Sequence, residues 1–136
     1  MNEAATETLA VVVEREIPYP PEKIWRALTQ PHLIEEWLMK NDFKPVVGHH
    51  SNLRGDWGAV DCEVRTVELN KTLSYTWDAM GLASVVTWTL TPTGTGTHLR
   101  MEQAGFRPDQ QQAFQGAKFG WQKFFGSLEQ VLARTE

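Results

Sequence analysis

The chain has 136 residues, of which 41% are hydrophobic and 22% charged, a composition typical of one globular domain and not of a disordered chain. Its net charge of −4, with no run of lysine or arginine, excludes the basic patch that nucleic-acid binding requires. No apolar run approaches the roughly 18 residues of a membrane span, and the polar first residues are unlike a secretory signal, so we expect a cytoplasmic protein.

The N-terminal part of the chain predicts one strand followed by two short helices. Residues 8–17 are rich in β-branched side chains and predict a strand, which a group of prolines ends. Pro21 suits the first turn of a helix over 21–29, because its missing N–H removes no hydrogen bond there. Pro31 ends this helix and begins a second one over 32–38.

The middle of the chain predicts an irregular segment followed by an antiparallel meander. Residues 39–58 are punctuated by glycines, and we expect only short extended pieces there, at 43–46 and 50–54. From Ala59 onward, hydrophobic and polar residues alternate in four runs separated by turn residues: 59–69, 72–78, 84–92 and 97–106. Successive strands joined by such short turns form an antiparallel meander.

The alternation assigns the residues of these four strands to a dry face and a wet face. The dry face is apolar apart from one glutamine and gathers Val60, Cys62, Val64, Leu73, Tyr75, Trp77, Val86, Trp88, Leu90, Leu99, Met101 and Gln103. The residues between them are mainly charged groups, serines and threonines, so the opposite face is exposed to water. Another element must therefore cover the dry face.

The segment 109–133 predicts the long helix that covers it, with Asp109 as the N-cap. At a period of 3.6 residues, one stripe is apolar except for a lysine and contains Phe114, Lys118, Trp121, Phe125, Leu128 and Leu132. Beside this stripe lie Ala113, Ala117, Gly120, Phe124 and Val131. Gly116 and Gly120 each cost about 1 kcal/mol relative to alanine, so small residues here either admit a neighbouring backbone or leave empty space.

Four segments, in this order, resemble those of one family. They are PEKIWRALT at 21–29 followed by Pro31 and Trp37, LSYTW at 73–77, GTGTHL at 94–99, and Gly120-Trp121 followed by Phe124, Phe125 and Leu128. The order resembles the START-like (SRPBCC) superfamily, and within it the branch related to the C-terminal domain of the activator of Hsp90 ATPase (AHSA1-like). One departure is Val47-Gly48-His49-His50, where the family often carries a Gly-Gly pair.

The resemblance covers about residues 9–132 and implies an α+β helix-grip fold. In that fold a curved antiparallel sheet of about six strands wraps around a long C-terminal helix, and two short helices follow the first strand. We therefore expect residues 1–136 to form a single domain of this kind, whose core spans about 9–132.

The inward aromatic residues and the resemblance together predict a ligand cavity between the sheet and the C-terminal helix. Ligand cavities are mostly apolar with a few polar groups, and we expect a small lipid-like or aromatic molecule as the occupant. The candidate lining residues are Trp37, Met39, Phe43, Trp57, Cys62, Tyr75, Trp77, Trp88, Met101, Gln103, Phe114, Trp121 and Phe125. Each ring alone is explained by core packing, so the prediction depends on their joint placement. Trp57 lies in an irregular segment and is a candidate lid.

Few residues in the sequence indicate a catalytic, metal or cofactor site. The nucleophile-elbow, phosphate-loop, dinucleotide and zinc-helix motifs are all missing. His49 and His50 are adjacent and would point to opposite sides of an extended chain, and Cys62 has no obvious partner, so we expect neither a metal nor a cofactor. Gln103 and Arg15 are the inward polar groups. Each either pairs within the protein, Arg15 with a carboxylate at the sheet edge, or orients the polar end of a ligand.

Two alternatives to ligand binding remain open. START-like relatives include cyclases and hydrolases that use one or two polar cavity residues, so a small enzyme is one alternative, although no inward Asp–His or Glu–His pair is evident. The resemblance also implies a regulator of an Hsp90-type ATPase. The activator has an N-terminal domain and an asparagine-tryptophan motif that engages the chaperone, and the sequence contains neither. The expected partner is thus a small hydrophobic ligand, with the protein a monomer or homodimer.

Overall fold

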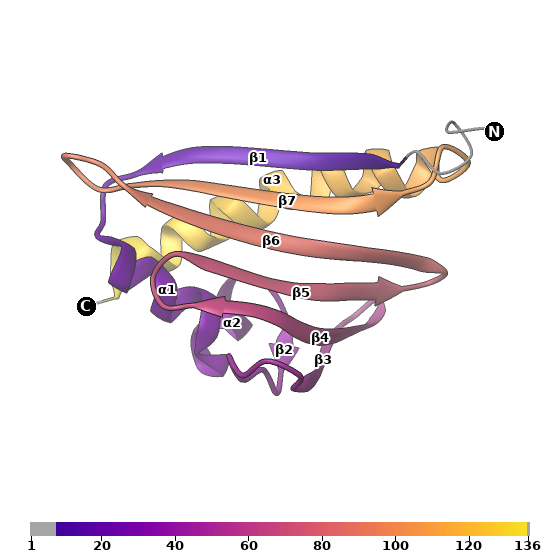
Figure 1. The fold of residues 1–136 in the computed structure, drawn as a ribbon, viewed down its shortest axis with the longest axis horizontal. Helices are drawn as coiled ribbons and strands as arrows, with labels where there is room; N and C mark the ends of the chain where they lie inside the picture. The colour runs from indigo at the N-terminus through magenta and orange to yellow at the C-terminus, as the bar shows by residue number, and fades with distance from the viewer. Residues whose placement is uncertain (1–7, 136) are drawn as a thin grey trace.

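A computed structural model describes residues 8–135 and shows a curved sheet with one long and two short helices on one side (Figure 1). The elements in chain order are β1 (Leu9–Ile17), α1 (Pro21–Thr29), α2 (Pro31–Trp37), β2 (Lys40–Asn41), β3 (His50–Gly55), β4 (Gly58–Glu68), β5 (Thr72–Ala79), β6 (Leu82–Pro92), β7 (Thr97–Phe106) and α3 (Gln111–Arg134). The sequence-based expectations for residues 1–7 lie outside the described residues. No helix in the described part has the length and apolar character needed to cross a membrane.

All seven strands form one antiparallel sheet in the order β1-β7-β6-β5-β4-β3-β2. Strands β3 to β7 follow one another as a meander, and β1 pairs with β7 at the far edge. The predicted α+β helix-grip fold is confirmed. The sheet has seven strands where about six were expected, and one of them, β2, is only two residues long.

The predicted dry face is confirmed, and two β-bulges extend it. The register shifts between Val64 and Thr66, so Val67 also packs against the core. A second shift lies at the Phe106 end of β7, where Gly105 has a φ of +120° and Phe106 is fully buried. A bulge adds one residue to a strand, so the side chains beyond it change face. Strict alternation assigned inward residues only as far as Gln103.

Two local predictions are wrong. Residues 43–46 form no strand; instead the Asn41 side chain accepts a hydrogen bond from the Phe43 backbone N at 3.1 Å and turns the chain. The N-cap of α3 is Gln110, not Asp109. The carboxylate of Asp109 pairs with the side chain of Arg107 at 3.1 Å, so it does not cap the helix.

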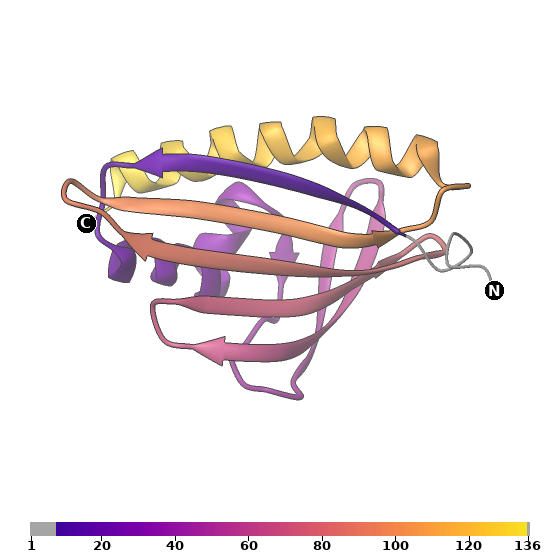
Figure 2. The same ribbon diagram turned by 45° about the horizontal axis from the view of Figure 1, so that its top comes forward.

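The helix α3 crosses the concave side of the sheet, and α1 and α2 lie on the same side (Figure 2). It contacts α1, α2, β1 and β7. Its buried residues begin at Trp121, near the middle of the helix, and are Trp121, Phe125, Leu128, Val131 and Leu132. The predicted apolar stripe is therefore buried only from Trp121 onward. In the N-terminal half Phe114 and Ala117 are half-buried, and Ala113 is exposed.

Candidate functional site

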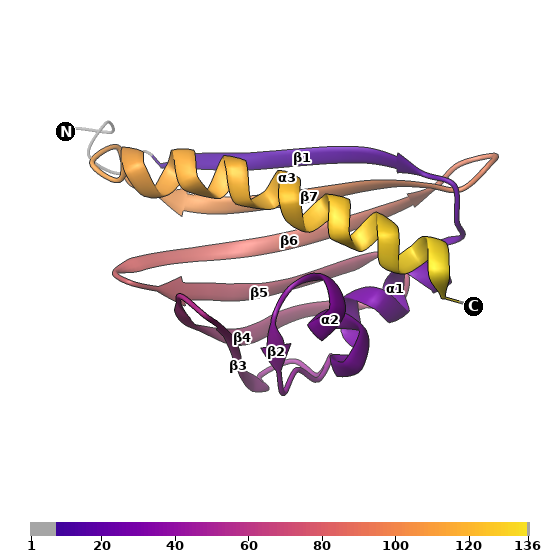
Figure 3. The ribbon, with the colours of Figure 1, turned by 180° about the vertical axis from the view of Figure 1, so that it is seen from behind.

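A cavity of about 660 Å³ lies between the N-terminal half of α3 and the sheet, beside the turn from β5 to β6. Figure 3 shows α1 and α2 near the C-terminal half of α3, while the N-terminal half extends toward the end of the sheet where β5 turns into β6. The lining residues are Trp57, Trp77, Ala79, Met80, Leu82, Gln103, Asp109, Gln110, Gln112, Ala113, Gly116, Ala117, Gly120, Trp121 and Phe124. The volume lies within the range of about 300–1,000 Å³ that is common for small-molecule sites.

The cavity exists because the helix presents small residues to it. Ala113, Gly116, Ala117 and Gly120 recur at helical spacing on one side of α3, and all four line the cavity. A Cβ added to either glycine would meet no atom within 4 Å. The glycines therefore do not serve a close backbone contact. Of the two explanations for small residues in this helix, the structure supports empty space.

Four aromatic side chains, from Trp57, Trp77, Trp121 and Phe124, also line the cavity. Trp77 from β5 and Trp121 from α3 have ring centroids 5.3 Å apart, and Phe124 packs edge-on against Trp121 at 5.4 Å. Trp57, in the turn between β3 and β4, is 49% exposed, and Met80, in the turn between β5 and β6, is 83% exposed. These two exposed apolar side chains mark where the cavity opens to solvent.

The Trp57 indole folds back over Gly55. A Cβ on Gly55 would lie 3.0 Å from Trp57 Nε1 and 3.4 Å from the Met39 side chain. The distance to Trp57 Nε1 is shorter than ordinary van der Waals contact, so a glycine at this position lets the ring lie close to β3. The position of Trp57 at the rim thus depends on a missing side chain two residues earlier.

One buried polar group, Gln103, lines the cavity from β7 and is held on two sides. Its Oε1 accepts a hydrogen bond from Trp121 Nε1 at 2.7 Å, and its Nε2 donates to Ser84 Oγ at 3.0 Å. Ser84 in turn donates to the backbone oxygen of Trp77 at 2.8 Å. A tryptophan Nε1 only donates, so the amide orientation is determined. One N–H and one lone pair of the amide remain for a ligand.

The other predicted site residues lie mainly in the core beneath the cavity. Those with at most 6% exposure that do not line it are Trp37, Met39, Phe43, Cys62, Tyr75, Trp88, Met101 and Phe125. Trp88 is at the centre, with ring centroids 5.7 Å from Trp37, 5.8 Å from Trp121 and 5.6 Å from Phe125. Phe114 is half-buried and packs against Phe106 at 5.5 Å. These residues therefore belong to the hydrophobic core, or in the case of Phe114 pack against it, and do not line the cavity.

The structure thus brings Trp57, Trp77, Gln103 and Trp121 of the predicted set into the lining. Sequence reasoning missed Phe124, the β5–β6 hairpin residues and the small residues of α3 as lining groups. The small residues did carry a signal, since alanines and glycines recur on one side of the predicted helix. The hairpin residues carried none, because their proximity to α3 is tertiary.

The buried titratable groups are not prepared for reaction. Burial and the nearby carboxylates of Asp61, Asp78 and Asp42 raise the pKa of the Cys62 thiol to about 12. Burial also raises the pKa of Tyr75, whose hydroxyl accepts a hydrogen bond from Trp88 Nε1 at 3.0 Å. Both groups therefore stay protonated and are poor nucleophiles near neutral pH. Within the described residues, no cluster of His, Cys, Asp and Glu is arranged to hold a metal ion.

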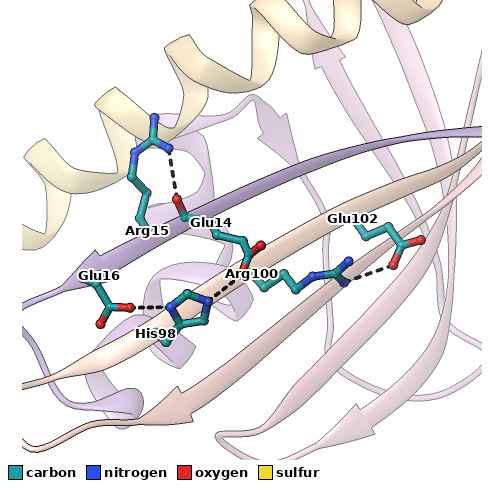
Figure 4. A network of polar contacts seen from close by, with 6 residues as sticks. All are labelled: Glu14, Arg15, Glu16, His98, Arg100 and Glu102. Atoms are coloured by element: carbon teal, nitrogen blue, oxygen red, sulfur yellow. Dashed lines mark hydrogen bonds and ion pairs between the residues drawn. The ribbon is translucent and has the colours of Figure 1, made fainter.

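Arg15 lies at the β1 edge and not in the cavity (Figure 4). Its guanidinium pairs with Glu129 of α3 at 3.5 Å and donates to Gln122 Oε1 at 2.5 Å. It also lies 5.4 Å from the centre of the Phe125 ring. The prediction that Arg15 pairs with a carboxylate at the sheet edge is confirmed. Arg15 thus links the edge strand β1 to α3 through these side-chain contacts.

His98 bridges two glutamates on the outer face of β1 and β7 (Figure 4). Its Nε2 lies 2.6 Å from Glu14 Oε1, and its Nδ1 bonds to Glu16. These two hydrogen bonds, the one to Glu16 first, raise the pKa of His98 above its ordinary value of 6.5. The cluster joins the edge strand to its neighbour on the face opposite the cavity.

The described structure has hollows elsewhere, and two of them have volumes comparable to that of the main cavity. One, of about 450 Å³, lies over β3, β4 and β5 and is lined mainly by polar and charged groups such as Asp61, Glu63 and Arg65. The other, of about 520 Å³, adjoins the main cavity and shares Trp57 and Phe124 with it. The main cavity has the most apolar lining of the three. It is also the one of the three that Gln103 lines, with its buried amide held in one orientation.

Solved structures share this fold over most of the chain. Protein MLL2253 from Mesorhizobium loti is 67% identical, with a TM-score of 0.91 over 94% of this chain and 99% of that one. Protein BH1534 from Bacillus halodurans is 27% identical, with a TM-score of 0.81 over 91% and 96% of the two chains. DynU16, from the dynemicin biosynthetic locus, is 26% identical with a TM-score of 0.84 over 92% of this chain, which spans 47% of DynU16. No curated protein matches the chain.

The family assignment follows from a match over most of the sequence. The family model described as "Activator of Hsp90 ATPase homolog 1-like protein" matches residues 18–133, from the end of β1 to the end of α3. The match includes both short helices, the whole meander and every residue that lines the cavity. The chain belongs to the family of Activator of Hsp90 ATPase homolog 1-like proteins.

Proposed function

We propose that the protein binds a small apolar molecule, aromatic or lipid-like, in the cavity between the N-terminal half of α3 and the sheet. The observation that carries this proposal is a cavity of about 660 Å³ with four aromatic lining residues and a buried amide held in one orientation. Burying about 200 Å² of apolar ligand surface contributes roughly 5 kcal/mol before the cost of association. Gln103 would orient a ligand that carries one hydrogen-bonding group.

The lining supports binding more than catalysis. General acid–base catalysis requires a positioned titratable group within hydrogen-bond reach of the substrate. Among the described residues that line the cavity, the one carboxylate is Asp109, which is exposed and paired with Arg107, and there is no histidine or cysteine. DynU16, a relative of similar fold, belongs to a biosynthetic locus, which is consistent with small molecules as ligands in this group.

Filling the cavity tests this proposal. Gly120→Leu adds a side chain at a lining position where a Cβ meets no atom within 4 Å, so the new side chain extends into the space a ligand needs. We expect at least a tenfold weaker affinity for the neutral fluorescent probe N-phenylnaphthylamine, measured by fluorescence titration, since the probe loses most of its buried apolar surface.

Gly126→Leu is the matched control. Gly126 is a third glycine of α3, and a Cβ there also meets no atom within 4 Å, but it does not line the cavity. Both variants gain a comparable amount of helix propensity, about 1 kcal/mol. If Gly120→Leu binds the probe as tightly as Gly126→Leu, or if the wild-type protein does not bind the probe, the proposed function is wrong.

A further inference from the structure

The hollow of about 520 Å³ next to the main cavity combines apolar and cationic groups. Trp57 and Phe124 line both spaces, so the two hollows adjoin at these residues. The other residues that line the second hollow are Leu38, Met39, Gly55, Asp56 and the two cationic residues Lys40 and Arg54. A ligand that fills the main cavity and extends past Trp57 and Phe124 would therefore place its far end near the cationic side chains of the second hollow.

Lys40 and Arg54 are directly opposite each other in the register of β2 and β3. Like charges at directly opposite positions of a sheet repel each other, so this pair is unfavourable without a counterion. Neither side chain forms an ion pair with any described residue. Asp56 lines the same hollow, so two cations face one carboxylate there. An anionic group between Lys40 and Arg54 would relieve their repulsion.

We infer that the ligand is an amphipathic anion whose apolar body fills the main cavity and whose acidic group binds between Lys40 and Arg54. This inference rests on the proposed function, because it requires the main cavity to hold the apolar body. The acidic group is a carboxylate, sulfonate or phosphate, since all of these accept hydrogen bonds from lysine and arginine. Trp57 and Phe124 lie where the two parts of the ligand join.

Two related probes separate the contributions of the cavity and of the cations. Anilinonaphthalene sulfonate carries the aromatic groups of N-phenylnaphthylamine plus one sulfonate. We expect the double variant Lys40→Gln/Arg54→Gln to bind the sulfonate probe about tenfold more weakly than the wild-type protein, because each ionic contact is worth roughly a factor of three. Its affinity for the neutral probe should be unchanged. Added salt should reduce the difference between the two proteins.

The control is Arg26→Gln/Lys71→Gln. It makes the same change in net charge at two exposed positions that line none of the three hollows. The inference is overturned if both double variants bind the sulfonate probe equally, while the neutral probe still binds and still responds to Gly120→Leu. Failure of the neutral probe to bind would instead refute the proposed function, and the inference with it.

Discussion

Gln103 holds neighbouring residues of the cavity lining in place through its side-chain hydrogen bonds. It connects Trp121 on α3 with Ser84 on β6, and through Ser84 the backbone of Trp77 on β5. Each partner is buried at no more than 7% exposure, so none can replace this hydrogen bond with one to bulk water. A single amide therefore joins the helix and two strands beneath the cavity.

We expect Gln103→Leu to lower the free energy of unfolding by about 1–3 kcal/mol. The change leaves the Trp121 Nε1 donor buried without an acceptor, which costs more than the hydrogen bond itself contributes. Urea unfolding followed by tryptophan fluorescence measures the effect. Gln112→Leu is the control, because Gln112 also lines the cavity but is exposed, and its change should stay within about 0.5 kcal/mol. Equal stability of the two variants would contradict the structural role of Gln103.

His98 makes a pH-dependent contribution to stability. Both of its ring nitrogens face carboxylates, so both must carry protons for the two bonds to form, and the bonds to Glu16 and Glu14 raise its pKa in the folded state. A raised folded pKa means that the stabilisation is fully present below the unfolded pKa of about 6.5 and is lost as the pH rises through the folded value.

The variant His98→Gln removes this titration. We expect the wild-type protein to exceed it in stability by more at about pH 6 than at about pH 9, as measured by urea unfolding at both values. The group is exposed and screened by solvent, so the change should be small. A stability difference that grows with pH would show that the protonated ring does not stabilise the fold.

At the scale of elements, the bulge at Gly105 determines which residues of β7 reach the core. Its φ of +120° is a conformation that side chains other than glycine rarely adopt. A Cβ at this position would lie 2.8 Å from the backbone oxygen of Ala83. The bulge turns Phe106 inward, and there Phe106 packs against Phe114 of α3. The exit from the sheet into the last helix depends on this residue.

We expect Gly105→Ala to lower the free energy of unfolding by about 2–4 kcal/mol, since backbone strain and a clash with a strand backbone act together. Gly81→Ala is the control, because Gly81 also has a positive φ, +84°, but a Cβ there meets no atom within 4 Å. It should cost about 1 kcal/mol from strain alone. Thermal unfolding that shows the same loss for both variants would mean that the close approach to Ala83 does not matter.

The two halves of helix α3 differ in the size of the side chains that they present to the sheet. From Trp121 onward its apolar side chains fill the space above the sheet, and Arg15 holds this half to β1 through Glu129. Before Trp121 its small residues leave that space open. A helix with large residues throughout would pack against the sheet along its whole length, so the order of large and small residues along α3 creates the cavity.

At the scale of the whole molecule, the curvature of the sheet and the position of its ends define the site. The hairpins β3–β4 and β5–β6 contribute Trp57 and Met80 to the rim of the same cavity, although these residues lie in different turns. Strand β2 is two residues long, yet it places Lys40 opposite Arg54 next to that rim. The buried hydrophobic residues from β1 to α3 form one core cluster, consistent with our proposal that the chain is a single domain.

The sequence by itself determined the four meander strands, the dry face and the helices, and the resemblance of four segments to the START-like superfamily implied the helix-grip fold. The strands, the dry face and the helices follow from local patterns: the period of two in the strands, the prolines around α1 and α2, and the apolar stripe of α3. It also indicated that Gln103 is buried and that Arg15 needs a carboxylate, because parity places both on the inner side. Local periodicity was sufficient for each of these.

Only the tertiary structure decided which aromatic residues line the cavity and which are packed inside the hydrophobic core. Trp77 and Trp88 share one face of the sheet, yet Trp77 lines the cavity and Trp88 is enclosed by Trp37, Trp121 and Phe125. The difference depends on where α1 and α2 end beneath α3, which no periodicity within a strand encodes. The bulge at Gly105 and the pairing of Lys40 with Arg54 were hidden for the same reason, since each depends on contacts between segments distant in the chain.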